Sequence, residues 1–368
     1  MTIAAGFALG MFALVVGADW LVKGSVRLAE RLRISSLVIG LTVVAFGTSA
    51  PELAVTMQAV ANGSPEIAIG NVVGSNIQNL MLVLGLSAMF VSLKVSRRIL
   101  WFDMPLLLVL TAAIGVMSMD GFISQDDGLL LFGTLAVYTW LSIKHGRTDE
   151  IPPSLDQTKS VSSDLTSGKA VASKRNGTMP LSVLQVIAGL YLLAEGGHLF
   201  VEAARSLALR FGMSELTIGV TVVAFGTSLP EIVTCVLAAI RGHRDLAVGN
   251  VIGSNIFNIL CVLGLTSATS AGGLPLSTTA VGIDIPLMLG VTILTYAVCL
   301  TGNRIVRGEG LLMLMIFGSY VGWLVPGSDA AMSTRNAIVG FGVGLTLLLV
   351  GFQIHALSRQ RWLPLPNR

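Results

Sequence analysis

The stretch VVAFGTSAPE, residues 43–52, recurs as VVAFGTSLPE at residues 222–231, and nine of the ten letters are unchanged. Around it, residues 40–85 align with residues 219–264 without a gap, and 25 of the 46 positions are identical. The chain therefore contains an internal duplication. Both copies lie in strongly apolar segments, so the polar Gly-Thr-Ser-x-Pro-Glu sequence that they share needs a physical reason.

The composition indicates a membrane protein. Of the 368 residues, 53% are hydrophobic and 12% are charged, and the mean hydropathy is +0.81, whereas soluble proteins carry about 25% charged residues. Eleven apolar runs are long enough to cross a hydrocarbon core of about 30 Å. They are residues 3–22, 37–62, 66–92, 101–119, 128–143, 180–204, 216–240, 247–269, 280–301, 309–327 and 336–357. The first run has no basic segment before it, so we interpret it as a span rather than as a signal peptide.

The duplication divides the first ten runs into two sets of five. Because five is odd, the second set enters the membrane from the opposite side, which gives the inverted repeats that are typical of secondary transporters. We therefore predict an all-α polytopic membrane protein with a ten-helix core of two inverted five-helix repeats and an eleventh, C-terminal helix. The predicted units are a first repeat at 1–144, a linker at 145–179, a second repeat at 180–328, and the extra helix with its tail at 329–368.

The lysine and arginine residues set the predicted orientation. With the N-terminus outside, 20 of the 23 basic residues fall in cytoplasmic segments, and only Arg205, Arg210 and Arg335 fall outside. The linker 145–179 is then cytoplasmic, and its Ser, Thr and Lys content predicts a flexible segment. This distribution explains the net charge of +3, so we expect no nucleic-acid partner. The sequence has no GxxxxGKS or GxxxxGKT phosphate loop, so we expect no nucleotide partner either.

Glu52 and Glu231 lie about fifteen residues into their spans, near the expected midplane of the bilayer. A carboxylate at that depth costs at least about 2.5 kcal/mol, and such residues normally face a bundle interior and mark an ion or proton pathway. Thr48 and Ser49 precede Glu52 by four and three residues, so on a helix their hydroxyls share its face. Thr227 and Ser228 repeat this pattern before Glu231.

Proline should bend both helices at this point. Pro51 and Pro230 have no backbone N–H and clash with the carbonyl four residues earlier. We expect a kink in each helix and free carbonyl oxygens at residues 45–47 and 224–226. Those oxygens need a partner, and a metal cation can provide one.

The helix that follows each glutamate carries a polar stripe. The sequences GNVVGSNIQN (70–79) and GNVIGSNIFN (249–258) place polar side chains at i, i+4 and i+8. The stripes consist of Asn71, Ser75 and Asn79 in the first repeat and Asn250, Ser254 and Asn258 in the second. The glycine pairs Gly70 with Gly74 and Gly249 with Gly253 predict close helix approach, as a shared ion site requires.

These groups form an all-oxygen set of carboxylates, hydroxyls, amide oxygens and carbonyls. Such a set favours hard cations, and flexible oxygens suit Ca²⁺ better than Mg²⁺. Na⁺ is nearly the size of Ca²⁺ and accepts the same ligands, and one Ca²⁺ or two Na⁺ would neutralise the two glutamates. The four histidines are scattered and the three cysteines lie in apolar runs, so we expect no zinc site, no disulfide framework and no cofactor.

The doubled GTSxPE and GNxxGSN sequences resemble the signature repeats of the Ca²⁺/cation antiporter superfamily, and most closely those of prokaryotic sodium/calcium exchangers. The resemblance implies an ion-coupled transporter and not an enzyme, with Ca²⁺ and Na⁺ as transported ions, in the inner membrane of a prokaryotic cell. We expect the lipid bilayer and small cations as its partners and one chain to be sufficient for transport. In such relatives the first and sixth helices, here 3–22 and 180–204, slide across the core to alternate access.

The resemblance also implies a set of metal ligands. They are Glu52, Glu231, Thr48, Ser49, Thr227, Ser228, Ser75, Ser254, Asn79, Asn258 and the carbonyls of Ala45 and Ala224. Potassium-dependent relatives carry an aspartate at one of the positions of Asn79 and Asn258. Asparagine at both positions argues against K⁺ co-transport.

Three other functions compete with Na⁺/Ca²⁺ exchange. A Ca²⁺/H⁺ antiporter could use the same glutamates, because a carboxylate in a low dielectric can titrate near neutrality. An intramembrane hydrolase would need an acid and a base in unlike surroundings, which the symmetric motifs oppose. A cation channel is the third alternative, but broken helices in inverted repeats favour an alternating site.

Several polar residues also have structural interpretations. Isolated Gly, Thr and Ser residues in membrane helices usually serve packing. We expect Asn76 and Asn255 to form interhelical hydrogen bonds, and Asp103 and Asp284 to cap helices. A further group on the sixth helix could line an aqueous path, bind coupling protons or form a polar interface with neighbouring helices. It consists of Glu195, His198 and Glu202.

Overall fold

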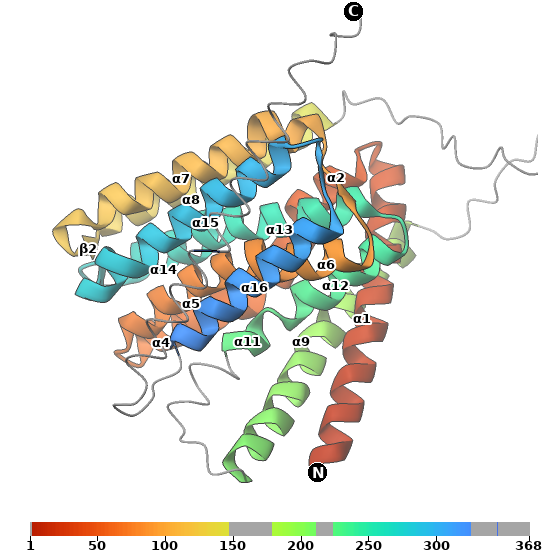
Figure 1. The fold of residues 1–368 in the computed structure, drawn as a ribbon, viewed down its shortest axis with the longest axis horizontal. Helices are drawn as coiled ribbons and strands as arrows, with labels where there is room; N and C mark the ends of the chain where they lie inside the picture. The colour runs from red at the N-terminus through yellow and green to blue at the C-terminus, as the bar shows by residue number, and fades with distance from the viewer. Residues whose placement is uncertain (1, 147–178, 211–223, 325–343, 345–368) are drawn as a thin grey trace, which may run out of the picture.

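The structure, a computed structural model, describes residues 2–146, 179–210, 224–324 and 344 (Figure 1). The described residues leave out the predicted eleventh helix at 336–357 except residue 344, almost all of the linker 145–179, and residues 216–223 of the seventh span. The described chain is almost entirely helical, and seven helical segments within it are long and apolar enough to cross a membrane. The protein is an all-helical polytopic membrane protein, as the sequence predicts.

The helices of the first repeat follow the predicted spans closely. The second span contains α2, α3 and α4, the third contains α5 and α6, and short π-helical turns connect several of these pieces. The bounds are α1 (Ile3–Leu32), α2 (Ser36–Ile39), α3 (Ala45–Thr48), α4 (Ala50–Ala61), α5 (Pro65–Gln78), α6 (Leu84–Phe90), α7 (Met104–Met117) and α8 (Gln125–Gly146).

The second repeat contains the equivalent elements. They are α9 (Met179–Arg210), α11 (Ala224–Thr227), α12 (Leu229–Ile240), α13 (Arg244–Phe257), α14 (Gly264–Thr269), α15 (Ile285–Leu300) and α16 (Arg307–Leu324). The helices α8 and α16 match the predicted spans at 128–143 and 309–327 but are less apolar than the seven, because polar and charged residues begin them.

The two longest helices, α1 and α9, extend well beyond the predicted spans at 3–22 and 180–204. They have 30 and 32 residues, because a helix continues past its apolar stretch when the following residues are good helix formers. The Thr2 hydroxyl caps α1 by accepting the Ala5 amide, 3.3 Å away, and Arg33 ends the helix in the left-handed conformation. The two helices lie side by side and project from the rest of the molecule (Figure 1).

Glycine allows α1 and α9 to pack backbone against backbone. A Cβ atom on Gly17 would lie 2.9 Å from the carbonyl oxygen of Gly189, and one on Gly189 would lie 2.6 Å from the amide nitrogen of Leu21. Gly10 and Gly196 pack in the same way nearer the N-terminus of α1, where a Cβ atom on Gly10 would lie 2.9 Å from the Gly196 carbonyl oxygen. Any larger side chain at these four positions would force the two helices apart.

Elements of one repeat pack reciprocally on those of the other. Gly85 of α6 contacts Gly310 of α16, and the equivalent Gly264 of α14 contacts Gly128 of α8. A Cβ atom on Gly310 would lie 2.7 Å from the Gly85 carbonyl oxygen, and one on Gly128 would lie 2.7 Å from that of Gly264. The third helix of each half is therefore held by the fifth helix of the other. Opposite orientation of the halves in the bilayer stays a prediction.

Two short β ribbons repeat this exchange between the halves. The strand β1 (Leu93–Lys94) pairs antiparallel with β4 (Arg304–Ile305), and β2 (Phe122–Ile123) pairs with β3 (Leu274–Pro275). In each ribbon one strand comes from each repeat, and a leucine opposes an isoleucine. All four of these side chains are fully buried. The sequence analysis did not predict these strands, because two residues give no period to recognise.

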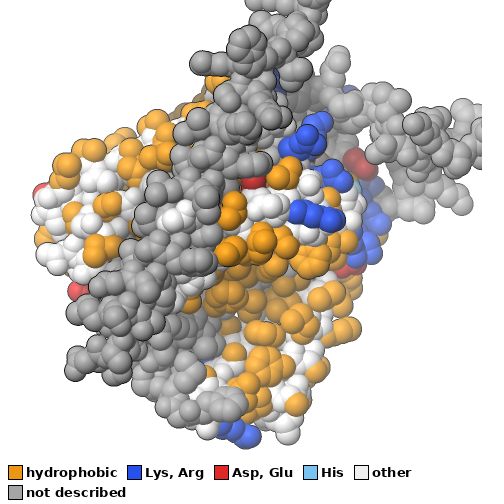
Figure 2. Space-filling view, viewed as in Figure 1, with side chains coloured by type: hydrophobic (Ala, Val, Ile, Leu, Met, Phe, Trp, Pro, Cys, Tyr) orange, Lys and Arg blue, Asp and Glu red, His pale blue; other side chains and the backbone are white. Residues whose placement is uncertain are grey.

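The segment from α13 to α14 forms the centre of the molecule, and its most apolar stretch is completely buried. The helices α2, α3, α12 and the π-helical turn at 40–44 all contact α13. Hydrophobic side chains cover much of the visible outer surface, and Lys and Arg gather mainly at the upper right of the view (Figure 2). This separation of apolar surface and basic charge is what a protein in a bilayer requires.

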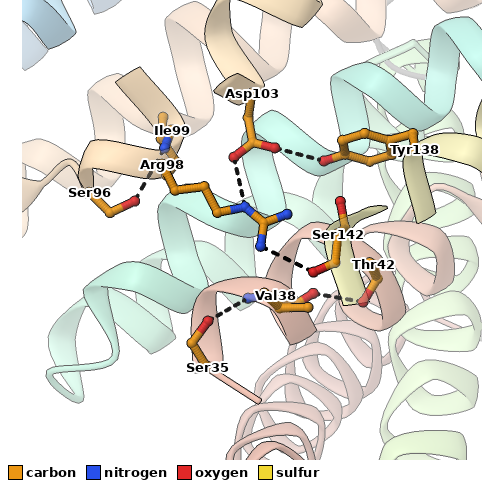
Figure 3. A network of polar contacts seen from close by, with 9 residues as sticks. All are labelled: Ser35, Val38, Thr42, Ser96, Arg98, Ile99, Asp103, Tyr138 and Ser142. Carbon is orange, nitrogen blue, oxygen red and sulfur yellow. Dashed lines mark hydrogen bonds and ion pairs between the residues drawn. The ribbon is translucent and has the colours of Figure 1, made fainter. Parts of the chain in front are cut away.

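A buried polar network, which includes the ion pair of Arg98 with Asp103, joins the segment before α7 to α8 (Figure 3). Nε of Arg98 lies 3.4 Å from Oδ2 of Asp103, the hydroxyl of Tyr138 donates to Oδ1 of Asp103 over 3.2 Å, and Nη1 of Arg98 donates to the Ser142 carbonyl. Neither Asp103 nor Asp284 makes a side-chain capping bond, so the predicted capping role is wrong. Position 279 of the second repeat, aligned with Arg98, is a threonine, so only the first repeat can form this ion pair.

Replacement of Tyr138 by phenylalanine should lower the stability of the fold. Tyr138→Phe leaves a buried oxygen of Asp103 without its donor, at a cost of about 1–3 kcal/mol. We expect a lower apparent melting temperature in detergent. Tyr191→Phe is the matched control, because Tyr191 is 64% exposed on α9. Equal melting temperatures for the two variants would contradict the role of this network.

Candidate cation site

Both helices that carry the glutamates break at the serine of the repeated motif. The helix α3 ends at Thr48, Ser49 has φ −83° and ψ 3°, and α4 begins at Ala50. In the second repeat α11 ends at Thr227, Ser228 has φ −90° and ψ 4°, and α12 begins at Leu229. A proline occupies the first turn after each break, which confirms the predicted bends.

The freed carbonyl is not that of Ala45. Its oxygen accepts the Ser49 amide over 3.0 Å and also lies 3.4 Å from the Thr48 hydroxyl. The carbonyl that loses a helical donor is that of Gly47, because Pro51 has no N–H to offer. Coordination by Ala45 and by its counterpart Ala224, at the start of α11, stays a prediction, and at Ala45 it would have to add to these existing bonds.

The two glutamates lie close together in the interior. Glu52 is 1% exposed and Glu231 is fully buried, and each carboxyl lies within electrostatic range of the other. The Ser49 hydroxyl donates to Oε1 of Glu231 over 3.5 Å, and Thr48 also contacts Glu231. Thr227 in turn contacts Glu52. The hydroxyls of each repeat therefore contact the carboxylate of the other repeat.

The polar stripe of α13 completes one wall of this site. Oγ1 of Thr48 lies 3.4 Å from Oγ of Ser254 and 3.3 Å from Oδ1 of Asn250. The close approach depends on glycine: a Cβ atom on Gly253 would lie 2.7 Å from the Leu41 carbonyl oxygen. Gly249 meets Leu37 in the same way, at 2.8 Å. The predicted glycine contact is confirmed for Gly249 and Gly253, whereas a Cβ atom on Gly70 or Gly74 would meet no other described element within 4 Å.

Several buried polar atoms in these elements have no hydrogen-bond partner within the described part of the chain. They are Oε2 of Glu52, Oε2 of Glu231, Oγ of Ser228, Oδ1 of Asn79 and both amide atoms of Asn258. A buried oxygen without a partner costs about 1–3 kcal/mol, and a cation can satisfy several at once. Among the described residues no group of three or more His, Cys, Asp and Glu lies together. Two carboxylates with neutral oxygens fit a hard cation as the bound substrate.

Side-chain contacts join six of the predicted ligands into one cluster, and the Ala45 carbonyl borders it through Thr48. Linked by the contacts above are Glu52, Glu231, Thr48, Ser49, Thr227 and Ser254. Among the described residues, four further predicted ligands are buried but form no hydrogen bond with either glutamate: Ser75, Ser228, Asn79 and Asn258. Their coordination stays a prediction.

Other polar residues behave differently from the sequence analysis. Asn76 and Asn255 each donate to the carbonyl four residues earlier in their own helix, both over 2.8 Å, so the predicted interhelical bonds are wrong. Glu195, His198 and Glu202 lie on the exposed side of α9. The sequence analysis named Asn250 as part of a stripe but missed its contact with Cys235, because residues 15 apart on two helices give no local signal.

Comparisons with known proteins identify the family of the chain. Residues 2–144 and 181–325 match the family described as sodium/calcium exchanger protein. The chain belongs to this family. It is 36% identical to a putative antiporter, CaxA, of Alkalimonas amylolytica, over 87% of this chain and 98% of that protein. It is 32% identical to the sodium/calcium exchanger MaX1 of Methanosarcina acetivorans, over 85% of this chain and 95% of that protein.

A solved structure shows the same fold. The sodium-calcium exchanger NCX_Mj, soaked with Na⁺ and Ca²⁺, superposes with a TM-score of 0.73 at 32% identity, covering 88% of this chain and 99% of that chain. These relatives are exchangers and antiporters. The protein is accordingly a membrane antiporter of the calcium/cation class, and not an enzyme.

Binding of Ca²⁺ should stabilise the folded protein through the two glutamates. A ligand that binds only the native state adds RT ln(1 + [L]/Kd), about 2.7 kcal/mol at a hundredfold excess over Kd. We expect Ca²⁺ to raise the apparent melting temperature of the wild type and to have little effect on Glu52→Gln or Glu231→Gln. Glu66→Gln is the matched control, since Glu66 is exposed at the start of α5. An unchanged Ca²⁺ effect in Glu52→Gln would exclude this carboxylate as a ligand.

Proposed function

We propose that the protein exchanges Na⁺ for Ca²⁺ by alternating access, with the ions bound between the two repeats at the bilayer midplane. The observation that carries the proposal is the pair of buried carboxylates, Glu52 and Glu231, each in contact with hydroxyls of the opposite repeat. A site shared by two halves can open to either side when the halves move relative to each other.

The charge of the site supports coupling between the two ions. Two carboxylates are neutralised by one Ca²⁺ or by two Na⁺, so the ions compete for the same oxygens rather than bind together. Any further Na⁺ would make the exchange electrogenic. The remaining proposed ligands are the neutral groups predicted from the sequence: Ser75, Ser228, Asn79, Asn258 and the carbonyls of Ala45 and Ala224.

The proposed setting follows the distribution of basic residues. The N-terminus lies outside, the linker 145–179 lies in the cytoplasm, and the membrane is the inner membrane of a prokaryotic cell. The first repeat occupies 1–144, the second 180–328, and an extra helix with its tail follows at 329–368. One chain is sufficient for transport, because both carboxylates come from the same chain.

The decisive experiment is Ca²⁺ flux in proteoliposomes. Vesicles loaded with Na⁺ and diluted into Na⁺-free medium should take up radioactive Ca²⁺, and a protonophore that collapses the pH gradient should leave this uptake intact. Vesicles loaded with choline provide the control. Uptake that follows an imposed pH gradient and ignores Na⁺ would overturn the proposal in favour of Ca²⁺/H⁺ antiport.

The glutamates should be required for this flux. We expect Glu52→Gln and Glu231→Gln each to abolish exchange, because a neutral amide cannot balance the charge of the cation. Both variants should elute normally in size-exclusion chromatography, and the control Glu66→Gln should transport at the wild-type rate. Near-normal exchange in either glutamate variant would remove the proposed site.

A further inference from the structure

We propose that Asn250 is a positioning residue of the cation site: its carboxamide oxygen accepts the hydrogen bond of the Thr48 hydroxyl and so turns the oxygen lone pairs of Thr48 towards the ion. The inference rests on the proposed function, since it assumes that Thr48 is a ligand of the transported cation. It adds a role for a residue outside the predicted ligand set, and for Cys235, which holds it.

A hydroxyl group can coordinate a cation through its oxygen only if its proton is directed away from the cation. It has one proton and two lone pairs, so a second acceptor must receive the proton. Near Thr48 the neutral acceptors are Oδ1 of Asn250 at 3.3 Å, Oγ of Ser254 at 3.4 Å and the Ala45 carbonyl at 3.4 Å. The Ala45 carbonyl already accepts the Ser49 amide.

Ser254 and Glu231 are less suitable acceptors for the Thr48 hydroxyl. Ser254 is itself a predicted ligand, so its own hydroxyl also needs a hydrogen-bond acceptor. Glu231 also contacts Thr48, but a proton directed at this carboxylate would compete with the cation for its oxygens. Asn250 is fully buried, neutral and not a predicted ligand, which makes it the suitable acceptor.

Cys235 of α12 fixes the orientation of this carboxamide. Nδ2 of Asn250 donates to Sγ of Cys235 over 3.2 Å, and Sγ of Cys235 in turn donates to the Ala247 carbonyl over 3.5 Å. The donors therefore run in one direction, from Thr48 to Asn250, from Asn250 to Cys235 and from Cys235 to the backbone. A flipped amide would set an N–H group against Thr48 and, because the thiol proton of Cys235 is directed at the Ala247 carbonyl, would leave Oδ1 facing sulfur without a donor.

The first repeat contains the same device with different chemistry. Nδ2 of Asn71 donates to Oγ1 of Thr56 over 2.9 Å and to the Glu52 carbonyl over 3.2 Å. Thr56 aligns with Cys235, and Asn71 aligns with Asn250. A polar side chain one turn after each glutamate thus holds the asparagine at the start of the stripe in the same repeat. Two occurrences in aligned positions argue against an accidental contact.

The test is a pair of nearly isosteric substitutions at Cys235. Cys235→Thr introduces the residue of the aligned position and keeps an acceptor for the Asn250 amide, so the KM for Ca²⁺ should stay within about twofold of the wild type. Cys235→Val has the same shape without the acceptor, and its KM should rise about tenfold while kcat stays within about twofold. Asn250→Ala should show the same increase in KM or a larger one.

The matched control is Cys299→Val. Cys299 is also a fully buried thiol, but it lies in α15. We expect an unchanged KM for this variant. Equal KM values for Cys235→Thr and Cys235→Val, or a lower kcat with an unchanged KM in Asn250→Ala, would overturn the inference.

A second readout separates this inference from the proposed function. The Ca²⁺ concentration that gives half of the full increase in melting temperature reports binding without transport. It should rise about tenfold in Cys235→Val and stay constant in Cys235→Thr, even if the coupling ion is H⁺ rather than Na⁺. If the wild type is stabilised by Ca²⁺ and both variants respond alike, the positioning role is wrong while the cation site stands.

Discussion

The structure depends on keeping two carboxylates together in a place that water does not reach. Each buried charge without a partner costs several kcal/mol, and two of like sign also repel each other. Hydroxyls from the opposite repeat provide only part of the compensation, and among the described residues one oxygen of each carboxylate has no partner. In the proposed function the cation is therefore a structural component of the site as well as its substrate. In the proposed function, replacing one bound cation by another therefore costs less free energy than leaving the site empty.

The helix breaks, the glycines and the reciprocal packing all serve this arrangement. The breaks at Ser49 and Ser228 place the hydroxyls beside the glutamate positions, and Gly249 with Gly253 lets α13 approach the broken helix closely. Since each carboxylate is served from the other half, neither repeat holds a complete site. The division explains why the motif must occur twice in one chain.

The sequence was sufficient to predict the features that repeat or depend on local chemistry. The spans, the breaks at the proline motifs and the proximity of Glu52 to Glu231 all follow from the duplication and from the cost of a charge in lipid. Features set by distant partners were missed. The predicted cap at Asp103 is a bond to Tyr138, 35 residues later, and Asn250 meets Thr48 across 202 positions. No local pattern distinguishes such contacts.

The two β ribbons have a consequence for how the fold could have arisen. A strand of each half pairs with the non-equivalent strand of the other half, so two separate copies of one half could form both ribbons with each other. Such a homodimer would have twofold symmetry and identical glutamates facing each other. Once two gene copies are fused, the two halves of the chain can differ in sequence. At the positions aligned with Arg98 and Thr56, the second repeat has a threonine and a cysteine. A symmetric homodimer could not have carried these differences.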